Sequence, residues 1–430
     1  MIHAIKERRR TGRMNFALLA SMLLVIGACV SVPAPVDEEA VYIQRYLAQE
    51  RAAQTGGGLS NYDPLETVAG AQVISPLPSA TPGARDAALK EARNFVSARS
   101  SSAFIVWHKG TLIEETYFDG YNRDALINAK SLAKPLTAIL IGRAIAQGYI
   151  QSLDRPVADF ITEWKDDQRR SKILVRHLLD MRTGLLAQGI PTGPEDILQR
   201  AYLHPRHDEI IINEYPLTHE PGARYDYSNA NAEVVAPLIE RATRMRYARY
   251  LTKALLEPLG AAGGTIFVNR SGGMAHSGCC VQLPARTWLK LGILLLNDGV
   301  WNGRRLLPAG YAKAMRTPTR ENPNAGLGVW TGEPYAKWRG SLNPEFAMGR
   351  TFHSEPYAAS DLFLFDGNGN QVVYIVPSQD LIILRTGNYP PKERPWDNSI
   401  IPNLIIRGMT EPSSKLAPIG LAPASVPTGG

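Results

Sequence analysis

The stretch NAKSLAKPLTAIL, residues 128–140, places a serine three residues before a lysine at the start of a long apolar run. In a helix, residues i and i+3 lie on the same face, so Ser131 and Lys134 would be neighbours. Pro135 has no backbone N–H and is tolerated only near a helix start, which places the first turn at about Ser131. The helix dipole there would stabilise a serine alkoxide, and burial would favour a neutral Lys134 amine that takes or relays a proton. A capping serine beside a solvent-facing lysine gives the same pattern, so other parts of the chain have to decide.

A second motif, Tyr227-Ser228-Asn229, lies between a Pro-Gly turn and an apolar helix in EPGARYDYSNANAEVVAPLIE. Ser-x-x-Lys and Tyr-x-Asn each occur once in the chain. Tyr227 could act as a general base or proton shuttle beside Lys134, and Asn229 could hold a substrate amide or the lysine. The structural alternative is a core tyrosine followed by a helix-capping asparagine.

With both motifs present, the chain resembles the serine β-lactamase and penicillin-binding protein superfamily. The likeness is to its class C β-lactamase-like branch, which includes esterases, D,D-peptidases and 6-aminohexanoate-dimer hydrolases. It runs from about residue 103 to residue 388 and includes ILVRHLLDMRTGL, LEPLG and LKLGILLLNDGVWNGRRLLP. The resemblance implies that Ser131 is the acylated nucleophile, Lys134 its activating partner and Tyr227 the second catalytic base. Asn229 takes the place of the motif's asparagine.

The family's third motif, Lys-Thr-Gly or His-x-Gly on an edge strand, falls at DGNGNQVVYIV. If Gln371 opens the strand, Asn368, Gly369 and Asn370 take the place of the motif, with no cation and with Asn370 instead of the final glycine. The oxyanion hole would then consist of the backbone N–H groups of Ser131 and Gln371.

The fold class expected from the pattern is α/β and β-lactamase-like. Two β-rich runs surround His108-Lys109-Gly110, and QVVYIV and LIILRT form a second hairpin near the C-terminus. Helical signals dominate from residue 131 to about 257. Hairpins from both chain ends can join one antiparallel sheet flanked by helices, with an all-helical lobe inserted between them.

The N-terminus resembles a bacterial lipoprotein signal. A basic start, KERRRTGR, precedes an apolar stretch at 16–26 that is too short to span a bilayer comfortably and ends just before Cys29. Residues 1–28 are therefore expected to be a signal peptide and Cys29 the lipidated residue. Val30, rather than Asp, follows the cysteine, which favours the outer membrane. The expected location is the cell envelope, lipid-anchored and facing the periplasm.

Three further segments are expected after the signal. Residues 29–84 read as a tether and wrap-around segment, with a helix at about 36–54 and Gly- and Pro-rich breaks. The hydrolase domain follows at 85–410. Residues 411–430 form a Pro-, Ser- and Gly-rich tail that is expected to be disordered.

Charge and composition exclude several classes of function. Of the formal net charge of +7, +4 lies in the first 28 residues, and no basic run is interleaved with aromatics, so nucleic acid is not an expected partner. His204 and His207, in HPRH, lack a partner motif and are expected to be a loop pair, so neither a metal nor another cofactor is predicted. Cys279 and Cys280 are expected to be two buried thiols rather than a strained vicinal disulfide.

The predicted function is hydrolysis of esters or small amides through an acyl-enzyme, with weak β-lactam turnover. A charge-assisted hydrogen bond is about twice as strong as a neutral one, so Asn368 in place of a cation weakens recognition of the carboxylate that β-lactams share. Arg339 or Arg350 could supply a cation from a neighbouring segment. The alternatives are a D,D-peptidase or β-lactamase, and a non-catalytic cell-envelope binding lipoprotein. The expected partners are a small ester, amide or peptide substrate and, through the lipid anchor, the membrane.

Overall fold

The computed structural model describes residues 37–54, 63–80, 86–340 and 349–410. The predicted signal peptide, Cys29 and the C-terminal tail lie outside these ranges. None of the helices within them is long and apolar enough to cross a membrane.

A six-stranded antiparallel sheet forms the centre of the structure, with the strand order β3-β2-β14-β13-β12-β9. Its strands are β2 (Ser101–His108), β3 (Thr111–Tyr117), β9 (Trp330–Thr331), β12 (Phe363–Gly367), β13 (Gln371–Val376) and β14 (Leu381–Gly387). Both predicted hairpins are present, and β14 pairs with β13 on one side and with β2 on the other. Strands from both ends of the chain therefore build one sheet, which confirms the predicted fold class.

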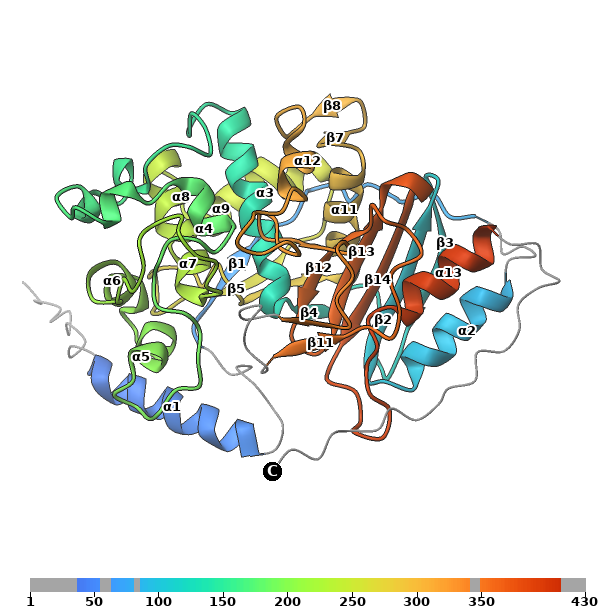
Figure 1. Ribbon diagram of the computed structural model, residues 1–430, viewed down its shortest axis with the longest axis horizontal. Helices are drawn as coiled ribbons and strands as arrows, with labels where there is room; N and C mark the ends of the chain where they lie inside the picture. Colours follow the sequence, from blue (N-terminus) through green and yellow to red (C-terminus); the bar gives the residue numbers. More distant parts are fainter. Residues whose placement is uncertain (1–36, 55–62, 81–85, 341–348, 411–430) are drawn as a thin grey trace, which may run out of the picture. The chain divides into compact units, whose positions relative to one another are not determined.

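Helices cover both faces of this sheet (Figure 1). On one face, α2 (Asp86–Ser97) and α13 (Ile400–Thr410) pack over Leu364, Tyr374 and Ile383. On the other, α3 (Ala133–Ala146) and α11 (Ala285–Leu296) pack over the residues that alternate with these, such as Phe365 and Val373. Because side chains of a strand alternate between faces, two covered faces require strands that are apolar throughout, as QVVYIV is. Each large apolar side chain buried here contributes about 1.5–3 kcal/mol.

The inserted lobe carries most of the helices. These are α4 (Val175–Leu179), α5 (Ile197–Leu203), α6 (His207–Asn213), α7 (Asn229–Glu233), α8 (Val235–Thr243), α9 (Tyr247–Leu251), the π-helical turn η5 (Thr252–Leu256) and α10 (Glu257–Leu259). Short 3-10 turns lie at η1 (Lys130–Leu132), η2 (Val157–Asp159), η3 (Thr162–Trp164), η4 (Arg170–Lys172) and η6 (Pro377–Gln379).

Beside these helices lies a second, four-stranded sheet, which the expectation of an all-helical lobe did not include. Its order is β1-β5-β6-β4, from β1 (Leu65–Val68), β4 (Leu126–Asn128), β5 (Gly264–Phe267) and β6 (Val281–Pro284). Strands of three or four residues are too short to give a readable periodicity. The remaining short elements are β7 (Val300–Trp301), β8 (Arg304–Arg305), α12 (Tyr311–Met315), β10 (Trp338–Gly340) and β11 (Arg350–Phe352).

The helix predicted near the N-terminus is α1 (Glu38–Gln54), which packs against α5 (Figure 1). Tyr42 is fully buried there, and its hydroxyl donates to the Pro194 carbonyl. Arg45 donates to the carbonyls of Leu203 at 2.9 Å and Asn269 at 2.8 Å. The helix α1 therefore contacts the helical lobe through specific residues.

Cys279 and Cys280 form a vicinal disulfide, which corrects the expectation of two thiols. The chain places both side chains in one small buried cluster with Tyr42, Tyr202 and Phe267. The Tyr202 hydroxyl lies 3.6 Å from the Cys280 sulfur. Two sulfurs held side by side without solvent are positioned to bond, whereas the sequence shows only that they are adjacent.

Candidate active site

Ser131 lies in the 3-10 turn η1, immediately before α3 begins at Ala133. Pro135 therefore falls in the first turn of α3, where a missing N–H leaves no intrahelical bond unmade. The Ser131 Oγ is 2.8 Å from the Tyr227 hydroxyl and 3.3 Å from the Lys134 Nζ. The structure thus brings together the serine, lysine and tyrosine that the two motifs supplied.

Lys134 is buried, with 4% of its surface exposed, and its amine has three polar neighbours. It donates to the Asn229 Oδ1 at 2.9 Å and to the Gly278 carbonyl at 3.0 Å. Its third direction points at the Ser131 Oγ. The two fixed acceptors occupy two directions of the amine, which leaves the third for the serine hydroxyl.

Tyr227 precedes α7, and Asn229 is the first residue of that helix. The Asn229 amide donates to the Gln188 Oε1 at 3.0 Å, and the Gln188 N–H donates to the Tyr227 carbonyl at 2.7 Å. Of the two roles open to Asn229, the structure shows the one of holding the lysine. Gln188 was missed because a single glutamine in a loop carries no sequence signal.

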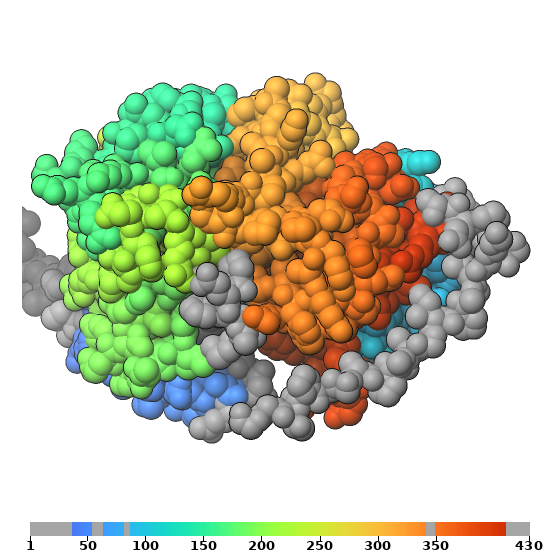
Figure 2. All heavy atoms as spheres, viewed as in Figure 1, coloured from blue at the N-terminus to red at the C-terminus, as the bar shows by residue number. Residues whose placement is uncertain are grey.

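A cleft of about 310 Å³, including its open mouth, adjoins the nucleophile. The helical lobe supplies one side and the segment after residue 320 the other, and Figure 2 shows these green and orange regions adjoining on one face. The described residues that line it are Ser131, Lys134, Leu179, Met181, Tyr225, Tyr227, Ala325, Gly326, Gly328, Val329, Trp330 and Asp366.

The end of β12 lies directly against the turn that carries Ser131. A Cβ added at Gly367 would lie 3.0 Å from the Leu132 nitrogen and 3.2 Å from the Ala129 carbonyl oxygen. β9 pairs with β12 only at Phe363 and Leu364, so β9 does not cover the outer edge of β12 after Leu364. Just before β12, the Leu362 carbonyl points to this outer side, where it accepts a hydrogen bond from the Gly332 N–H. By the alternation of an antiparallel ladder, the Asp366 N–H also points outward, towards the cleft.

The residues predicted for the third motif lie beside this edge. Gln371 opens β13 as expected, and it pairs with Gly367, so alternation turns its N–H into the hairpin. Its side chain donates to the Asn128 carbonyl at 2.8 Å. Gly369 and Asn370 accept from the buried Arg385 guanidinium through their carbonyls, and Asn368 is exposed.

None of these four residues belongs to the described lining of the cleft. Gln371 contacts the strand before the nucleophile, and Gly369 and Asn370 are held by Arg385. The geometry therefore points to the Asp366 N–H, rather than that of Gln371, as the second donor facing the cleft.

A cation does lie near the cleft, on β10. Arg339 has 4% of its surface exposed, pairs with the Asp366 carboxylate and lies 4.4 Å from the centroid of the Trp330 ring. Burial raises the pKa of the Asp366 carboxyl, and the guanidinium partly offsets this effect. Arg350 is exposed on β11. The positive charge of Arg339 is therefore already matched by a carboxylate.

The two histidines of HPRH do not face one another as a pair. The His204 Nε2 lies 3.5 Å from Glu39, whereas the His207 Nε2 lies 3.6 Å from the buried Glu233. A third histidine, His276, completes the latter cluster. Its members come from three separate segments, so no local sequence pattern could have indicated it.

Comparisons with known proteins agree with this architecture. The family model described as Beta-lactamase matches residues 90–399. A 6-aminohexanoate-dimer hydrolase of Paenarthrobacter ureafaciens is 26% identical over 226 residues, which are 50% of this chain and 57% of that protein. The match thus spans little more than half of the relative's length.

Solved structures show the same fold at low sequence identity. A provisionally assigned 6-aminohexanoate-dimer hydrolase from Bacillus anthracis has a TM-score of 0.61 at 21% identity, covering 80% of this chain and 90% of that one. A penicillin-binding protein homologue from Caulobacter crescentus has a TM-score of 0.56 at 16% identity, covering 77% and 98%.

Proposed function

The chain belongs to the β-lactamase family of serine hydrolases, and we propose that it cleaves esters or small amides through an acyl-enzyme on Ser131, with weak β-lactam turnover. The observation that carries the proposal is the contact of the Ser131 Oγ with both Tyr227, at 2.8 Å, and Lys134, at 3.3 Å. A nucleophile within hydrogen-bond reach of a base that is itself held by further groups is the arrangement that covalent catalysis requires.

In acylation, the Ser131 Oγ attacks the substrate carbonyl carbon while its proton passes to the Lys134 amine. Asn229 and Gly278 hold the other two N–H positions of that amine, so its lone pair stays on the serine. The tetrahedral intermediate collapses with cleavage of the bond to the leaving group. The leaving oxygen or nitrogen takes a proton from Lys134, relayed through the Tyr227 hydroxyl.

In deacylation, a water molecule takes the place of the leaving group and attacks the acyl carbon. Tyr227 and Lys134 accept its proton and return it to the Ser131 Oγ as the acid product departs. The developing oxyanion is held by two backbone N–H groups, those of Ser131 and Asp366. Two such donors, fixed before the reaction begins, are worth several kcal/mol; the loss of one typically costs about 10²–10³-fold in rate.

The preference for substrates without a carboxylate rests on the Arg339–Asp366 pair. A β-lactam or a D-Ala-D-Ala end brings a carboxylate, which meets the Asp366 side chain at the cleft before it reaches Arg339. Like charges at short range repel, and in a partly buried site they are little screened by salt. A neutral ester or amide avoids this repulsion.

The proposal is tested with the Ser131→Ala variant and a pair of substrates. The wild-type chain is expected to form an acyl adduct, seen by intact mass, and to hydrolyse p-nitrophenyl butyrate, while Ser131→Ala does neither. The wild-type kcat/KM for the ester should exceed that for a chromogenic cephalosporin. Wild-type turnover by the alanine variant would sink the mechanism, and the absence of any wild-type turnover would favour a non-catalytic binding protein.

A cephalosporin preference of several orders of magnitude would instead support the β-lactamase or D,D-peptidase alternative. Asp366→Asn supplies the converse test, because it removes the repelling charge and leaves Arg339 to meet a carboxylate. This variant should shift the ratio of kcat/KM values towards the cephalosporin. Asn368→Lys should shift it less, because it adds a charge on the exposed hairpin turn and leaves the Asp366 carboxylate in place.

A further inference from the structure

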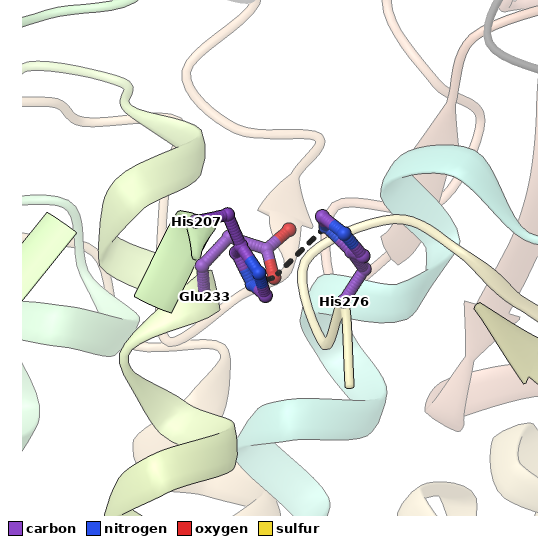
Figure 3. Close-up of side chains that lie close together, drawn as sticks. All are labelled: His207, Glu233 and His276. Atoms are coloured by element: carbon purple, nitrogen blue, oxygen red, sulfur yellow. Dashed lines mark ion pairs between the residues drawn. The ribbon is translucent and has the colours of Figure 1, made fainter. Parts of the chain in front are cut away.

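Three buried side chains, His207, Glu233 and His276, lie close together in the helical lobe (Figure 3). All three are at least 98% buried. The His207 Nε2 lies 3.6 Å and the His276 Nδ1 3.9 Å from the same carboxylate oxygen, Glu233 Oε2. One ligand atom from each residue lies within 4.8 Å of the other two.

Within the described part of the chain, hydrogen bonds leave polar atoms of two members of this cluster, His207 and Glu233, unsatisfied. Both ring nitrogens of His207 lack a hydrogen-bond partner in that part, and so does the Oε2 of Glu233. Buried polar groups are normally hydrogen-bonded, and buried charges are paired or bind metals. An imidazole nitrogen without a proton has a lone pair that a metal ion can accept.

The surroundings of His207 also fit a metal ligand. Its Nδ1 faces the Asp208 Oδ1 at 4.0 Å, and that oxygen accepts from the Asn269 amide at 2.7 Å. A ligating histidine usually donates its other ring N–H to such a carboxylate, and a movement of about 1 Å would bring Asp208 within hydrogen-bond distance. This arrangement leaves the Nε2, which faces Glu233, as the ligand atom.

We propose that His207, Glu233 and His276 bind one divalent transition-metal ion, of which Zn²⁺ is the representative. Two imidazole nitrogens and one carboxylate oxygen are ligands that Zn²⁺, Co²⁺ and related ions accept. The two rings stack with their centroids 3.9 Å apart and their planes at 17°. In stacked rings the lone pairs of the nitrogens lie in nearly parallel planes, so one imidazole has to rotate before both nitrogens can bind the same ion. The site departs from the expectation that the chain binds no metal.

The proposed ion is connected to the active site through α7 and Gly278. Asn229 begins α7 and holds Lys134, and Glu233 ends the same helix. The Glu233 Oε1 accepts from the Gly278 N–H at 3.3 Å, and the Gly278 carbonyl accepts from Lys134 at 3.0 Å. An ion bound to the Oε2 of Glu233 would hold this carboxylate in place, and with it the contacts from Glu233 through Gly278 to Lys134. Glu233 is thus a positioning residue for Lys134.

The binding test uses the full chain, dialysed against a chelator and then titrated with Zn²⁺ or Co²⁺ alone. The wild type should retain about one equivalent by mass spectrometry of metal content, develop visible ligand-field absorption with Co²⁺, and melt at a higher temperature with Zn²⁺. His207→Gln/His276→Gln and Glu233→Gln should retain less than a tenth as much. His353→Gln removes a buried histidine outside the cluster and should bind as the wild type does.

Retention of no more metal by the wild type than by the double variant would overturn the proposal. Should the variants not fold, as judged by circular dichroism, the wild type decides alone: failure to retain Zn²⁺ and to give the Co²⁺ spectrum rejects the site. These readouts do not depend on hydrolysis, so the proposed function can fail without affecting them.

The positioning role has a separate readout. Removing the ion should lower kcat for the ester while KM changes little, because the cleft lining contains none of the three ligands. Zn²⁺ should restore kcat in the wild type. In Glu233→Gln, kcat should stay low with or without Zn²⁺, and equal rescue of both proteins would contradict the role.

Discussion

At the scale of single residues, the proposed reactivity of Ser131 depends on the hydrogen bonds that position Lys134 and Tyr227. Asn229 and Gly278 occupy two directions of the Lys134 amine, and Tyr227 approaches the serine from the other side. The motifs predicted which side chains would meet, because a helix fixes the i to i+3 spacing and the family resemblance supplied the tyrosine. They could not predict Gln188 or Asp366, whose roles depend on contacts between distant segments.

Tyr227→Phe removes the 2.8 Å contact with Ser131 and keeps the aromatic ring. We expect kcat/KM for p-nitrophenyl butyrate to fall by about 10²–10⁴-fold, the usual contribution of a positioned acid or base. The matched control is Tyr215→Phe, which removes a hydroxyl that contacts Leu186 and Ser228 beside the site. The control should keep kcat/KM within a few-fold, and equal losses in both variants would argue against a special role for Tyr227.

His353 gives a pH dependence of stability. Burial and the nearby Arg339 lower the pKa of His353 to about 3, against about 6.5 in the unfolded chain. The folded state then binds fewer protons, so stability is complete above about pH 6.5 and is lost as the pH falls towards about 3. At about pH 4.5 the loss from this residue is about 3 kcal/mol.

The measurement compares the free energy of urea unfolding at about pH 7 and about pH 4.5. His353→Gln should show a smaller difference between the two conditions than the wild type. His219→Gln changes a half-exposed histidine of the helical lobe, whose Nδ1 lies 3.3 Å from Asp226, and should leave the difference as it is. A wild-type difference in His353→Gln would show that other groups cause the acid sensitivity.

At the scale of elements, the site depends on how closely β12 approaches the turn η1. The close contact of Gly367 with Leu132 and Ala129 leaves little room for a side chain. The sequence predicted the β2–β3 and β13–β14 hairpins because their apolar runs are long. The sequence did not predict that the Asp366 N–H faces the cleft. Which N–H groups of β12 point away from the sheet depends on how β12 pairs with β9 and β13.

Gly367→Val should push β12 away from the nucleophile. We expect kcat/KM for the ester to fall by at least about 10²-fold, the cost of a displacement of about 1 Å in a catalytic group. Gly408→Ala is the contrasting variant, since its Cβ would clash with Ala88 between α2 and α13. It should lower the melting temperature but leave kcat of the folded protein unchanged. A Gly367 variant that is destabilised with normal kcat would refute the argument.

At the scale of the whole molecule, we propose that the body described here is held at a membrane by acyl chains on Cys29. An anchor of this kind resists high salt and yields to detergent, because it is apolar rather than electrostatic. Wild-type protein from native membranes should therefore behave in this way, and Cys29→Ser should be recovered without lipid. An unmodified Met1 N-terminus on the native membrane-bound protein would overturn the assignment.

The construction of one sheet from both chain ends also governs when activity first arises during biosynthesis. Translation delivers Ser131, Lys134 and Tyr227 long before β12 and its oxyanion-facing edge exist. β2 pairs early with β3, but its other neighbour, β14, lies near the far end of the chain, and such long-range pairings make folding slow. A product truncated before Phe363 would carry the three proposed catalytic side chains, and we expect it to be inactive because it lacks β12 and β14. On the proposed function, hydrolysis would then begin only after the last strands of the sheet have been made.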